Sequence, residues 1–288
     1  MTVGTKSFPL RFDFFFYLCT MIINEVIAFL DSRFHPEYQE DYDNAGFLVG
    51  DGGTAYTGSL VALDLTPAVA DEAIAYGLNL IVTHHPLIFR GVRRITDATE
   101  TGRTLLKLIR AGVAVYAAHT NLDNMPDGVN GILADKLGLQ HCSILAPKHD
   151  APQHTPTTIG AGMVGTLPAP MEPEAFLMCV KEVLGLPVVR HSGLAGLSCC
   201  KVGRVAICGG SGSDFIDDAM RAGAEVYLTA DLKYHDFQRT GGRMLLADIG
   251  HYESEQFAKE IIYRAISEKF CNFACRISEC QQGVVHYI

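Results

Sequence analysis

Short apolar runs alternate with amphipathic segments along the first half of the chain. Runs rich in β-branched residues, such as Leu80 to Val82, are typical of buried strands, whereas apolar residues three and four apart are typical of helices. The pattern predicts, in order, a helix over 21–34, a turn and short strand over 41–50, a strand over 59–64, a helix over 67–76, a strand over 80–83, a helix over 101–111 and a strand over 113–118. Strands that alternate with helices of this length favour βαβ units and a parallel sheet.

The second half of the chain repeats this order, which indicates an internal duplication. The expected elements are a strand over 202–208, a helix over 214–222 and a strand over 225–229. A later strand in each half leads to a histidine followed four positions on by an acidic residue: His119 and Asp123, then His251 and Glu255. We therefore expect an α/β fold with two similar lobes, mixed or parallel sheets flanked by helices, and a metal site in the cleft between the lobes.

The pattern divides the chain into an N-terminal extension over 1–20, a first lobe over 21–140, a connecting segment or small subdomain over 141–200 and a second lobe over 201–288. The extension lacks the alternating pattern of the two lobes. Its apolar stretch is interrupted by Asp13 and is far shorter than the ~20 residues of a membrane span. We interpret it as the product of a start codon placed too early, and expect a chain that begins at Met21 to fold and assemble.

The composition is that of a globular protein with room for a full core, since 48% of the 288 residues are hydrophobic and 19% are charged. The formal net charge of −9 makes a nucleic-acid backbone an unlikely main partner and leaves small anionic ligands open. No membrane partner is expected. Nine cysteines without a C-x-x-C pair indicate reduced thiols and a cytoplasmic location, with Cys271, Cys275 and Cys280 on a helix face.

Two adjacent histidines, His84 and His85, come directly after the predicted strand over 80–83. Pro86 lacks an amide donor, so strand pairing should stop there. Neighbouring side chains on a flat strand point to opposite faces, so the two rings cannot easily chelate one ion. Where the strand breaks they can diverge, each toward its own metal. The alternative is a pair of histidines whose hydrogen bonds are satisfied within a loop.

Three more residues complete a candidate metal-binding set. His251 and Glu255 share a face if they lie on a helix, and a carboxylate there can bridge two cations. With Asp123 and the two adjacent histidines they supply three imidazoles and two carboxylates. These are too few ligands to saturate two metal ions, which leaves positions open for water or substrate. Alone, the His251 and Glu255 spacing would indicate a hydrogen-bonded surface pair, but the duplication favours a metal site.

Other polar residues near these strand ends are candidates for supporting roles. His119 could support a ligand, contact substrate or assist proton transfer. Asp231, Tyr234 and His235 occupy the matching turn of the second half, where they could orient ligands or handle protons. An ordinary loop network explains that turn equally well. We take His119 and His235 as the candidate catalytic residues.

Two glycine-rich stretches need separate interpretation. Residues 160–165 match the dinucleotide fingerprint G-x-G-x-x-G, but a proline stands where a helix should run, so we reject this interpretation. Residues 209–214 come after a strand and open a helix, so their amides could hold an anion. A tight turn capped by Ser213 or Asp214 is the simpler explanation. The sequence contains neither a G-x-S-x-G elbow nor a Walker A lysine motif.

Six motifs occur together between Met21 and the C-terminus: Asp43-Asn44-x-Gly46, Thr83-His84-His85-Pro86, His119-Thr120-Asn121-x-Asp123, Gly209-Gly210-Ser211-Gly212, Thr229-x-Asp231-x-x-Tyr234-His235 and Gly250-His251-x-x-x-Glu255. In this order they resemble the NGG-one-interacting-factor-three-like proteins, often described as GTP cyclohydrolase I type 2 homologues. Ala230 stands where that family usually has glycine, which affects a turn but no ligand. The larger inserted domain of some members is absent or much reduced between Gln140 and Lys201.

The resemblance implies a toroidal homohexamer of α/β subunits, with a dinuclear metal centre that faces an internal cavity. The ligands that it implies are His84, His85, Asp123, His251 and Glu255. We therefore expect two divalent metal ions per chain. Imidazole and carboxylate ligands suit zinc, iron, manganese, cobalt and nickel alike, so the sequence does not identify the metal.

The expected activity is metal-assisted hydrolysis of a small molecule, either nucleotide-like or a pterin precursor. Water would be the nucleophile, with His119 or His235 assisting proton transfer. An alternative of another class is a non-catalytic metal-binding hexamer that serves as a metal carrier or a protein-interaction scaffold. Turnover that depends on metal would favour the first function, and metal transfer without turnover the second.

Overall fold

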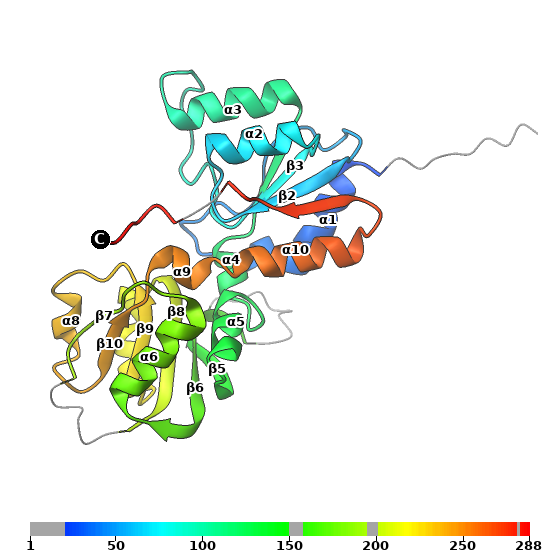
Figure 1. Ribbon diagram of the computed structural model, residues 1–288. Helices are drawn as coiled ribbons and strands as arrows, with labels where there is room; N and C mark the ends of the chain where they lie inside the picture. Colours follow the sequence, from blue (N-terminus) through cyan, green and yellow to red (C-terminus); the bar gives the residue numbers. More distant parts are fainter. Residues whose placement is uncertain (1–20, 150–157, 195–200, 281–282) are drawn as a thin grey trace, which may run out of the picture.

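The computed structural model describes residues 21–149, 158–194, 201–280 and 283–288, which form two α/β lobes (Figure 1). Each lobe is built around one mixed β-sheet, and helices cover the sheets. The predicted N-terminal extension over 1–20 lies outside the described residues. Within the described residues, no helix is both long enough and apolar enough to cross a membrane.

The first sheet combines strands from the two ends of the chain. Its order is β1 (Gly46–Val49), β4 (Ala114–Ala117), β3 (Leu80–Thr83), β2 (Gly58–Ala62) and β11 (Ala274–Ile277). Neighbouring strands are parallel except β1, which is antiparallel to β4. Four helices cover its two faces: α2 (Pro67–Ala75) and α3 (Glu100–Ala111) on one side, α1 (Ile23–Phe34) and α10 (Ala258–Lys269) on the other (Figure 1).

The second sheet has the order β5 (Gln140–Pro147), β6 (Gly160–Met171), β8 (Val202–Ser211), β9 (Val226–Ala230), β10 (Leu245–Asp248) and β7 (Arg190–His191). Strands β8, β9 and β10 are parallel, whereas the other neighbours are antiparallel. Helix α6 (Pro173–Leu184) packs on one face and α7 (Ile216–Arg221) on the other. The shorter helices are α4 (Thr120–Asp123), α5 (Val129–Lys136), α8 (Asp236–Arg239) and α9 (His251–Glu255), with 3-10 turns η1 (Pro36–Tyr38) and η2 (Ser213–Phe215).

The predicted duplication is confirmed by the strand order. In the first sheet β2, β3 and β4 are parallel neighbours, and β1 adds to β4 in the opposite direction. In the second sheet β8, β9 and β10 are arranged in the same way, and β7 adds to β10 in the opposite direction. The carboxyl ends of the parallel strands in both sheets therefore carry the polar motifs.

Local sequence signals explain where the helices of the first lobe begin and end. The Thr66 side chain accepts a hydrogen bond from the amide of Val69 (3.3 Å) at the start of α2, and Pro67 occupies the first turn. Thr99 caps α3 in the same way. Gly77 and Gly112 come after the two helices with φ of +66° and +68°, a conformation that favours glycine and stops each helix before the next strand.

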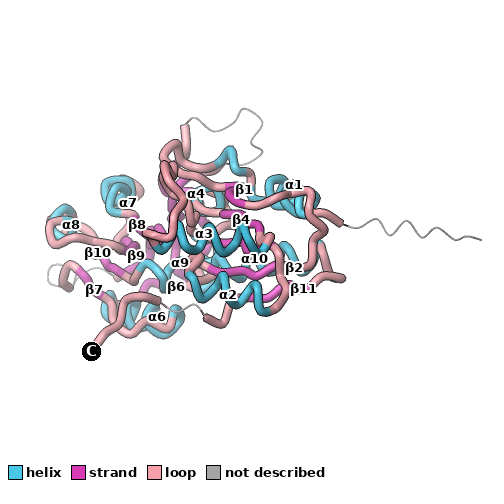
Figure 2. The backbone as a smooth tube through the Cα atoms, turned by 90° about the horizontal axis from the view of Figure 1, so that it is seen from above, coloured by secondary structure: helices cyan, strands magenta, loops and turns pink. Residues whose placement is uncertain are grey.

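One hydrophobic core joins the two lobes. Val61 and Val82 of the first sheet belong to the same buried cluster as Val205 and Leu228 of the second. Alternate residues of each strand face the opposite side and form separate clusters with α2 and α3, or with α7. Helix α10 reaches from the second lobe to lie along β2 and β11 (Figure 2). The lobes are thus packed together rather than linked loosely.

The structure differs from the predicted boundaries at two places. The described residues of 141–200 supply β5, β6 and β7, so they are part of the second sheet rather than a separate connection. The last strand, β11, pairs with β2 of the first sheet instead of remaining in the second lobe. The amide of Ser278 donates to the Val61 carbonyl (2.8 Å) and the amide of Glu279 to the buried Glu72 carboxylate (3.0 Å), which fixes this return.

Two smaller predictions have opposite outcomes. The helix-face placement of the last cysteines is wrong, because α10 ends at Lys269 and Cys275 lies in β11, with Cys271 and Cys280 outside any helix. The rejection of a dinucleotide loop over 160–165 is confirmed, because these residues form part of the long antiparallel strand β6.

Candidate metal centre

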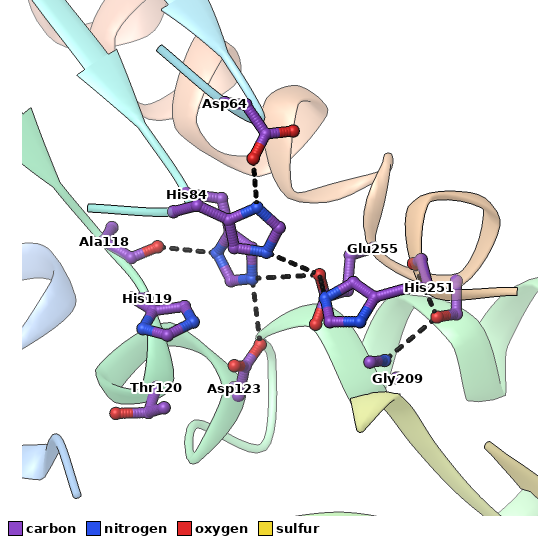
Figure 3. A network of polar contacts seen from close by, with 12 residues as sticks. Asp64, His84, Ala118, His119, Thr120, Asp123, Gly209, His251 and Glu255 are labelled. Atoms are coloured by element: carbon purple, nitrogen blue, oxygen red, sulfur yellow. Dashed lines mark hydrogen bonds and ion pairs between the residues drawn. The ribbon is translucent and has the colours of Figure 1, made fainter. Parts of the chain in front are cut away.

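The candidate ligands come from three elements that begin where parallel strands end. His84 and His85 come directly after β3, and their amides still donate to the carbonyl oxygens of Ala62, the last residue of β2, and of Leu63, which follows it. Helix α4 comes after β4 and carries Asp123, whereas α9 comes after β10 and carries both His251 and Glu255. Figure 3 shows the side chains of His84, Asp123, His251 and Glu255 converging. His85 lies in the same cluster, because its ligand atom is grouped with those of His251 and Glu255. The structure therefore brings together every candidate ligand predicted from the sequence.

The Glu255 carboxylate is the centre of this cluster. Its Oε2 lies 2.9 Å from Nε2 of His85 and 2.9 Å from Nε2 of His251. Nε2 of His84 lies 3.9 Å from the same oxygen and 3.6 Å from Oδ1 of Asp123. The Glu255 side chain is only 5% exposed, so its charge depends on these neighbours.

Ligand atoms in this cluster fall into three overlapping groups, with all the atoms of a group within 4.8 Å of one another. The groups are His84 with Asp123 and Glu255, His85 with His251 and Glu255, and His84 with His85 and His119. The adjacent histidines thus point into different carboxylate-containing groups, as predicted, although their ring centroids are only 5.0 Å apart. Glu255 belongs to both carboxylate-containing groups, that of His84 and that of His85.

Each of the four histidines has its Nδ1 atom engaged by an oxygen. At 2.7 Å in every case, the partners are the Ala118 carbonyl for His84, Asp64 for His85, Asp43 for His119 and Asp231 for His251. A carbonyl oxygen only accepts, so Nδ1 of His84 donates its hydrogen to Ala118, and Nε2 is the nitrogen that faces the carboxylates of Asp123 and Glu255. Histidines that bind metal are usually oriented by such contacts on the other nitrogen.

Nε2 of His84 is a buried polar atom without a hydrogen-bond partner, on a side chain that is 0% exposed. Buried polar groups in proteins are almost always paired, so this nitrogen needs a partner in the cluster. A divalent cation bound by imidazole nitrogens and carboxylate oxygens would fill that role. The residues present therefore fit a metal ion.

The electrostatics of the cluster also fit bound cations. Although burial alone would raise the pKa of Glu255, its contacts with His251, His84 and His85 hold it well below the usual range. Burial lowers the pKa of His85, but hydrogen bonds with Asp64 and Glu255 raise it to about 10. In this state the protonated rings of His85 and His251 supply positive charge beside Glu255. Metal ions would replace them, since imidazole must lose its proton to bind.

The remaining charges have the same physical basis. Burial opposes protonation of His251, but Glu255 and Asp231 raise its pKa to about 9. Burial raises the pKa of Asp123 to about 7, against the opposing effect of His84 and with a further contribution from Glu255. The raised pKa means that Asp123 favours a proton over a second negative charge near Glu255. A bound metal ion would replace that proton.

The glycine-rich stretch over 209–214 serves Glu255 rather than an anion. The amide of Gly209 donates to Oδ1 of Asn130 (2.8 Å) and that of Gly210 to the Ser254 hydroxyl (3.0 Å), so neither amide is free. Gly210 has φ of +64°, and a Cβ atom there would run into the Glu255 carboxylate. The expected cap by Ser213 or Asp214 is not found, because β8 continues through Ser211 and neither η2 nor α7 has a side-chain cap.

The two candidate catalytic histidines have different positions. The His119 ring lies edge-on to both His84 and His85, with centroids 5.3 and 5.4 Å away. His235 is exposed, and its Nδ1 lies 3.3 Å from Gln238. Among the described residues, His235 belongs to none of the three ligand groups. The geometry thus supports a role in the cluster for His119 and not for His235.

Sequence reasoning missed two groups that orient the ligands. Asp64 comes after β2, at the same sheet edge as His85, and its Oδ1 contacts Nδ1 of that histidine. Its place just after a strand was the one feature of the sequence that could have indicated this role. The Ala118 carbonyl has no sequence signature at all. Asp231, which was predicted as an orienting group, takes φ of +57° and holds Nδ1 of His251. Aspartate tolerates this left-handed conformation better than most residues do.

Two cavities open onto the cluster from different sides. One of about 670 Å³ is lined by His119, Asp123 and Glu255, together with Tyr42, Lys148 and Phe215. The other, of about 540 Å³, is lined by Asp64, His85 and Asp231, together with Arg190, Tyr252 and Tyr287. His251 lines both cavities. Each is large enough for a small-molecule ligand.

The fold and the site define a two-lobed α/β protein with a candidate metal centre between the lobes. The chain belongs to the Duf34/NIF3 (NGG1p interacting factor 3) family, whose model matches residues 21–283. This confirms the resemblance seen in the sequence motifs.

Individual relatives agree with this assignment. The GTP cyclohydrolase 1 type 2 homolog of Clostridium perfringens is 35% identical over 238 residues, which are 82% of this chain and 87% of the relative. The crystal structure of the Staphylococcus aureus hypothetical protein SA1388 has a TM-score of 0.82 at 32% identity and covers 93% of this chain and 99% of its own. A Bacillus cereus protein related to NIF3 shares the fold, with a TM-score of 0.83 at 24% identity over 93% of this chain and 100% of its own.

The contact between Gly210 and Glu255 generates a test of the metal centre. Gly210→Ala should weaken metal binding roughly tenfold, as loss of a group that supports a ligand typically does, because the new methyl group displaces the carboxylate. Gly223→Ala is the matched control, since Gly223 has φ of +71° but faces open space. Both variants should lose about 1 kcal/mol of stability from backbone strain. Equal metal affinity in the two variants, measured by titration with Zn²⁺, would contradict the cluster geometry.

Proposed function

We propose that this chain is a metal-dependent hydrolase that binds two divalent ions and acts on a nucleotide-like or pterin-precursor substrate. The observation that supports it best is the position of the Glu255 carboxylate. Its Oε2 lies 2.9 Å from Nε2 of His85 and 2.9 Å from Nε2 of His251, with which it forms one ligand group. Glu255 also belongs to the ligand group of His84 and Asp123. A carboxylate shared by two groups suits a pair of cations about 3.5–4 Å apart. His84 and Asp123 would hold one ion, His85 and His251 the other.

The comparisons support the substrate class. Relatives at 32–35% identity are described as GTP cyclohydrolase 1 type 2 homologs. The cavity of about 670 Å³ beside the cluster is large enough for a nucleotide, and it combines aromatic, basic and acidic side chains. The mixed imidazole and carboxylate donors suit zinc, iron, manganese, cobalt or nickel.

When bound, divalent ions in such a site lower the pKa of water and stabilise negative charge that develops on the substrate. The protein groups then position water and substrate and move protons. Asp43 holds Nδ1 of His119 at 2.7 Å, which leaves the other ring nitrogen as the proton carrier. Although burial opposes it, hydrogen bonds from His119, Thr120 and the Asn44 amide lower the pKa of Asp43 to about 2. Asp43 therefore stays charged and fixes the orientation of His119.

The activity itself can be tested by removing and restoring metal. The purified protein should hydrolyse at least one member of a panel of nucleotides, pterin precursors and phosphoesters, lose at least roughly 90% of that turnover after chelation and regain it on reloading. Product formation is measured by chromatography. Transfer of the metal to an acceptor protein with no turnover on any panel member would instead identify a metal carrier and reject the hydrolase.

Two substitutions test the shared carboxylate. Glu255→Gln keeps the shape of the side chain but removes its charge, so it should lower the occupancy of both ions and reduce turnover. His85→Ala should deplete one ion more than the other, because His85 belongs to one carboxylate-containing ligand group, the group with His251 and Glu255, and not to the group of His84 and Asp123. Glu268→Gln, an exposed change on α10, is the control for loss of one negative charge. Elemental analysis that finds full metal content in Glu255→Gln, or at most one ion in the parent protein, would refute the two-ion proposal.

We also propose that the chain assembles as a closed homohexamer, as the family resemblance implies. Closed symmetric assemblies are the usual form of soluble homo-oligomers. Multi-angle light scattering at micromolar concentration should therefore report about six times the chain mass of 31.3 kDa. A monomer mass under these conditions would rule the assembly out.

A further inference from the structure

The loop between β3 and α3 has an unusual concentration of positive charge. Residues 87–96, here called the rim loop, contain Arg90, Arg93 and Arg94, in a chain whose net charge is −9, and the one acidic residue between β3 and α3 is Asp97, directly after this stretch. Residues 89–96 are all exposed. The loop begins directly after His84, His85 and Pro86, so it starts at the metal centre.

No partner in the described part of the chain neutralises these three arginines. None of them forms an ion pair or a side-chain hydrogen bond with a described residue, whereas Arg33, Arg190, Arg221 and Arg239 each pair with an aspartate. Like charges held together in one loop repel one another, and a bound anion relieves that repulsion. Guanidinium groups match phosphate well because they offer paired donors in one plane.

The residue before Arg90 is an exposed aromatic, Phe89, and a second exposed ring, Tyr42, lies near it. Phe89 is 40% exposed and Tyr42 is 68% exposed, and their ring centroids are 6.4 Å apart. The Phe89 ring also lies 6.0 Å from that of His119. Exposed rings of this size are costly in water, and a planar ligand stacked on them would remove apolar surface from solvent.

Hydrogen bonds connect this surface to the catalytic side of the cluster. The Asn44 side chain donates to the carbonyl oxygen of Ile88 in the rim loop (2.5 Å). The preceding residue, Asp43, holds His119. Tyr42 and His119 both line the cavity of about 670 Å³ that contains Asp123 and Glu255. Tyr42 therefore connects Phe89 of the rim loop with the space next to the candidate metal centre.

We infer that the rim loop, with Tyr42, is a recognition site for a nucleoside polyphosphate, in which arginines contact the phosphates and the aromatic pair contacts the base. This inference rests on the proposed function for its substrate class. Charge complementarity favours a polyanion, and the exposed rings favour a planar group on the same molecule. A nucleoside polyphosphate carries both features, whereas a free phosphate or a neutral heterocycle carries one.

The test is a binding measurement on the metal-loaded protein, separate from turnover. Calorimetric titrations use three probes: β,γ-imido GTP, inorganic tripolyphosphate and guanosine. The triple variant Arg90→Ala, Arg93→Ala and Arg94→Ala should bind β,γ-imido GTP and tripolyphosphate at least roughly tenfold more weakly, with guanosine unchanged. Phe89→Leu should weaken β,γ-imido GTP and guanosine several-fold and leave tripolyphosphate unchanged.

The matched control is the triple variant Arg110→Ala, Lys201→Ala and Arg264→Ala. It removes the same charge at three exposed positions outside the rim, and none of these residues has an ion pair in the described structure. It should bind all three probes like the parent. Affinity of the parent for β,γ-imido GTP should also fall steeply with salt, and less steeply in the rim variant.

Binding of β,γ-imido GTP that is equal in the rim and control variants would overturn the inference, and so would no binding to the parent. A rim variant that changes only the oligomer mass would assign the arginines to a contact between copies, which also overturns it. Binding that matches the predicted pattern without turnover on any substrate would sustain the recognition site while the proposed hydrolase fails. Turnover of a neutral substrate at a rate that the rim substitutions leave unchanged would support the proposed hydrolase and overturn the recognition site.

Discussion

The buried charge of Glu255 is the constraint on which the rest of the site depends. A carboxylate with a side chain only 5% exposed is tolerated only when positive charge and hydrogen-bond donors surround it. His251 comes from the same helix, but His84 and His85 come from the other lobe. The charge of one residue is therefore compensated only when the two lobes are packed together, so the fold and the candidate metal centre stabilise each other.

This dependence explains several features that otherwise look unrelated. The core that contains Val82 and Leu228 joins the two sheets and fixes the distance between β3 and α9. Gly210 lets the backbone of β8 pass directly against the carboxylate. An oxygen on Nδ1 of every histidine sets the direction of its ring. Each of these features restricts the positions that the ligand atoms can take, as a preorganised metal site requires.

The sequence predicted the parts of this arrangement that local patterns carry. The parallel strands β2, β3 and β4 were predicted from alternating apolar runs and helices, and the ligands from their places after strand ends. Asp64 and Ala118 could not be assigned to His85 and His84, because the register of β3 between β2 and β4 decides those contacts. The return of β11 to the first sheet depends on Glu72, whose partners are more than 200 residues away in sequence.

Net charge describes the distribution of charge in this protein poorly. The formal value of −9 is a total over the whole chain, and it hides two local surroundings of opposite charge. Around Glu255, carboxylates and imidazoles are arranged to hold cations. In the rim loop, which comes after His84 and His85 in the chain, Arg90, Arg93 and Arg94 carry positive charge that no described side chain neutralises. In the proposed recognition site, an anion would meet positive charge first from guanidinium groups and then from the metal ions that the cluster would hold. An acidic protein can in this way be selective for an anionic small molecule, because the potential at its site is set by the nearest groups and by low screening, and not by the total.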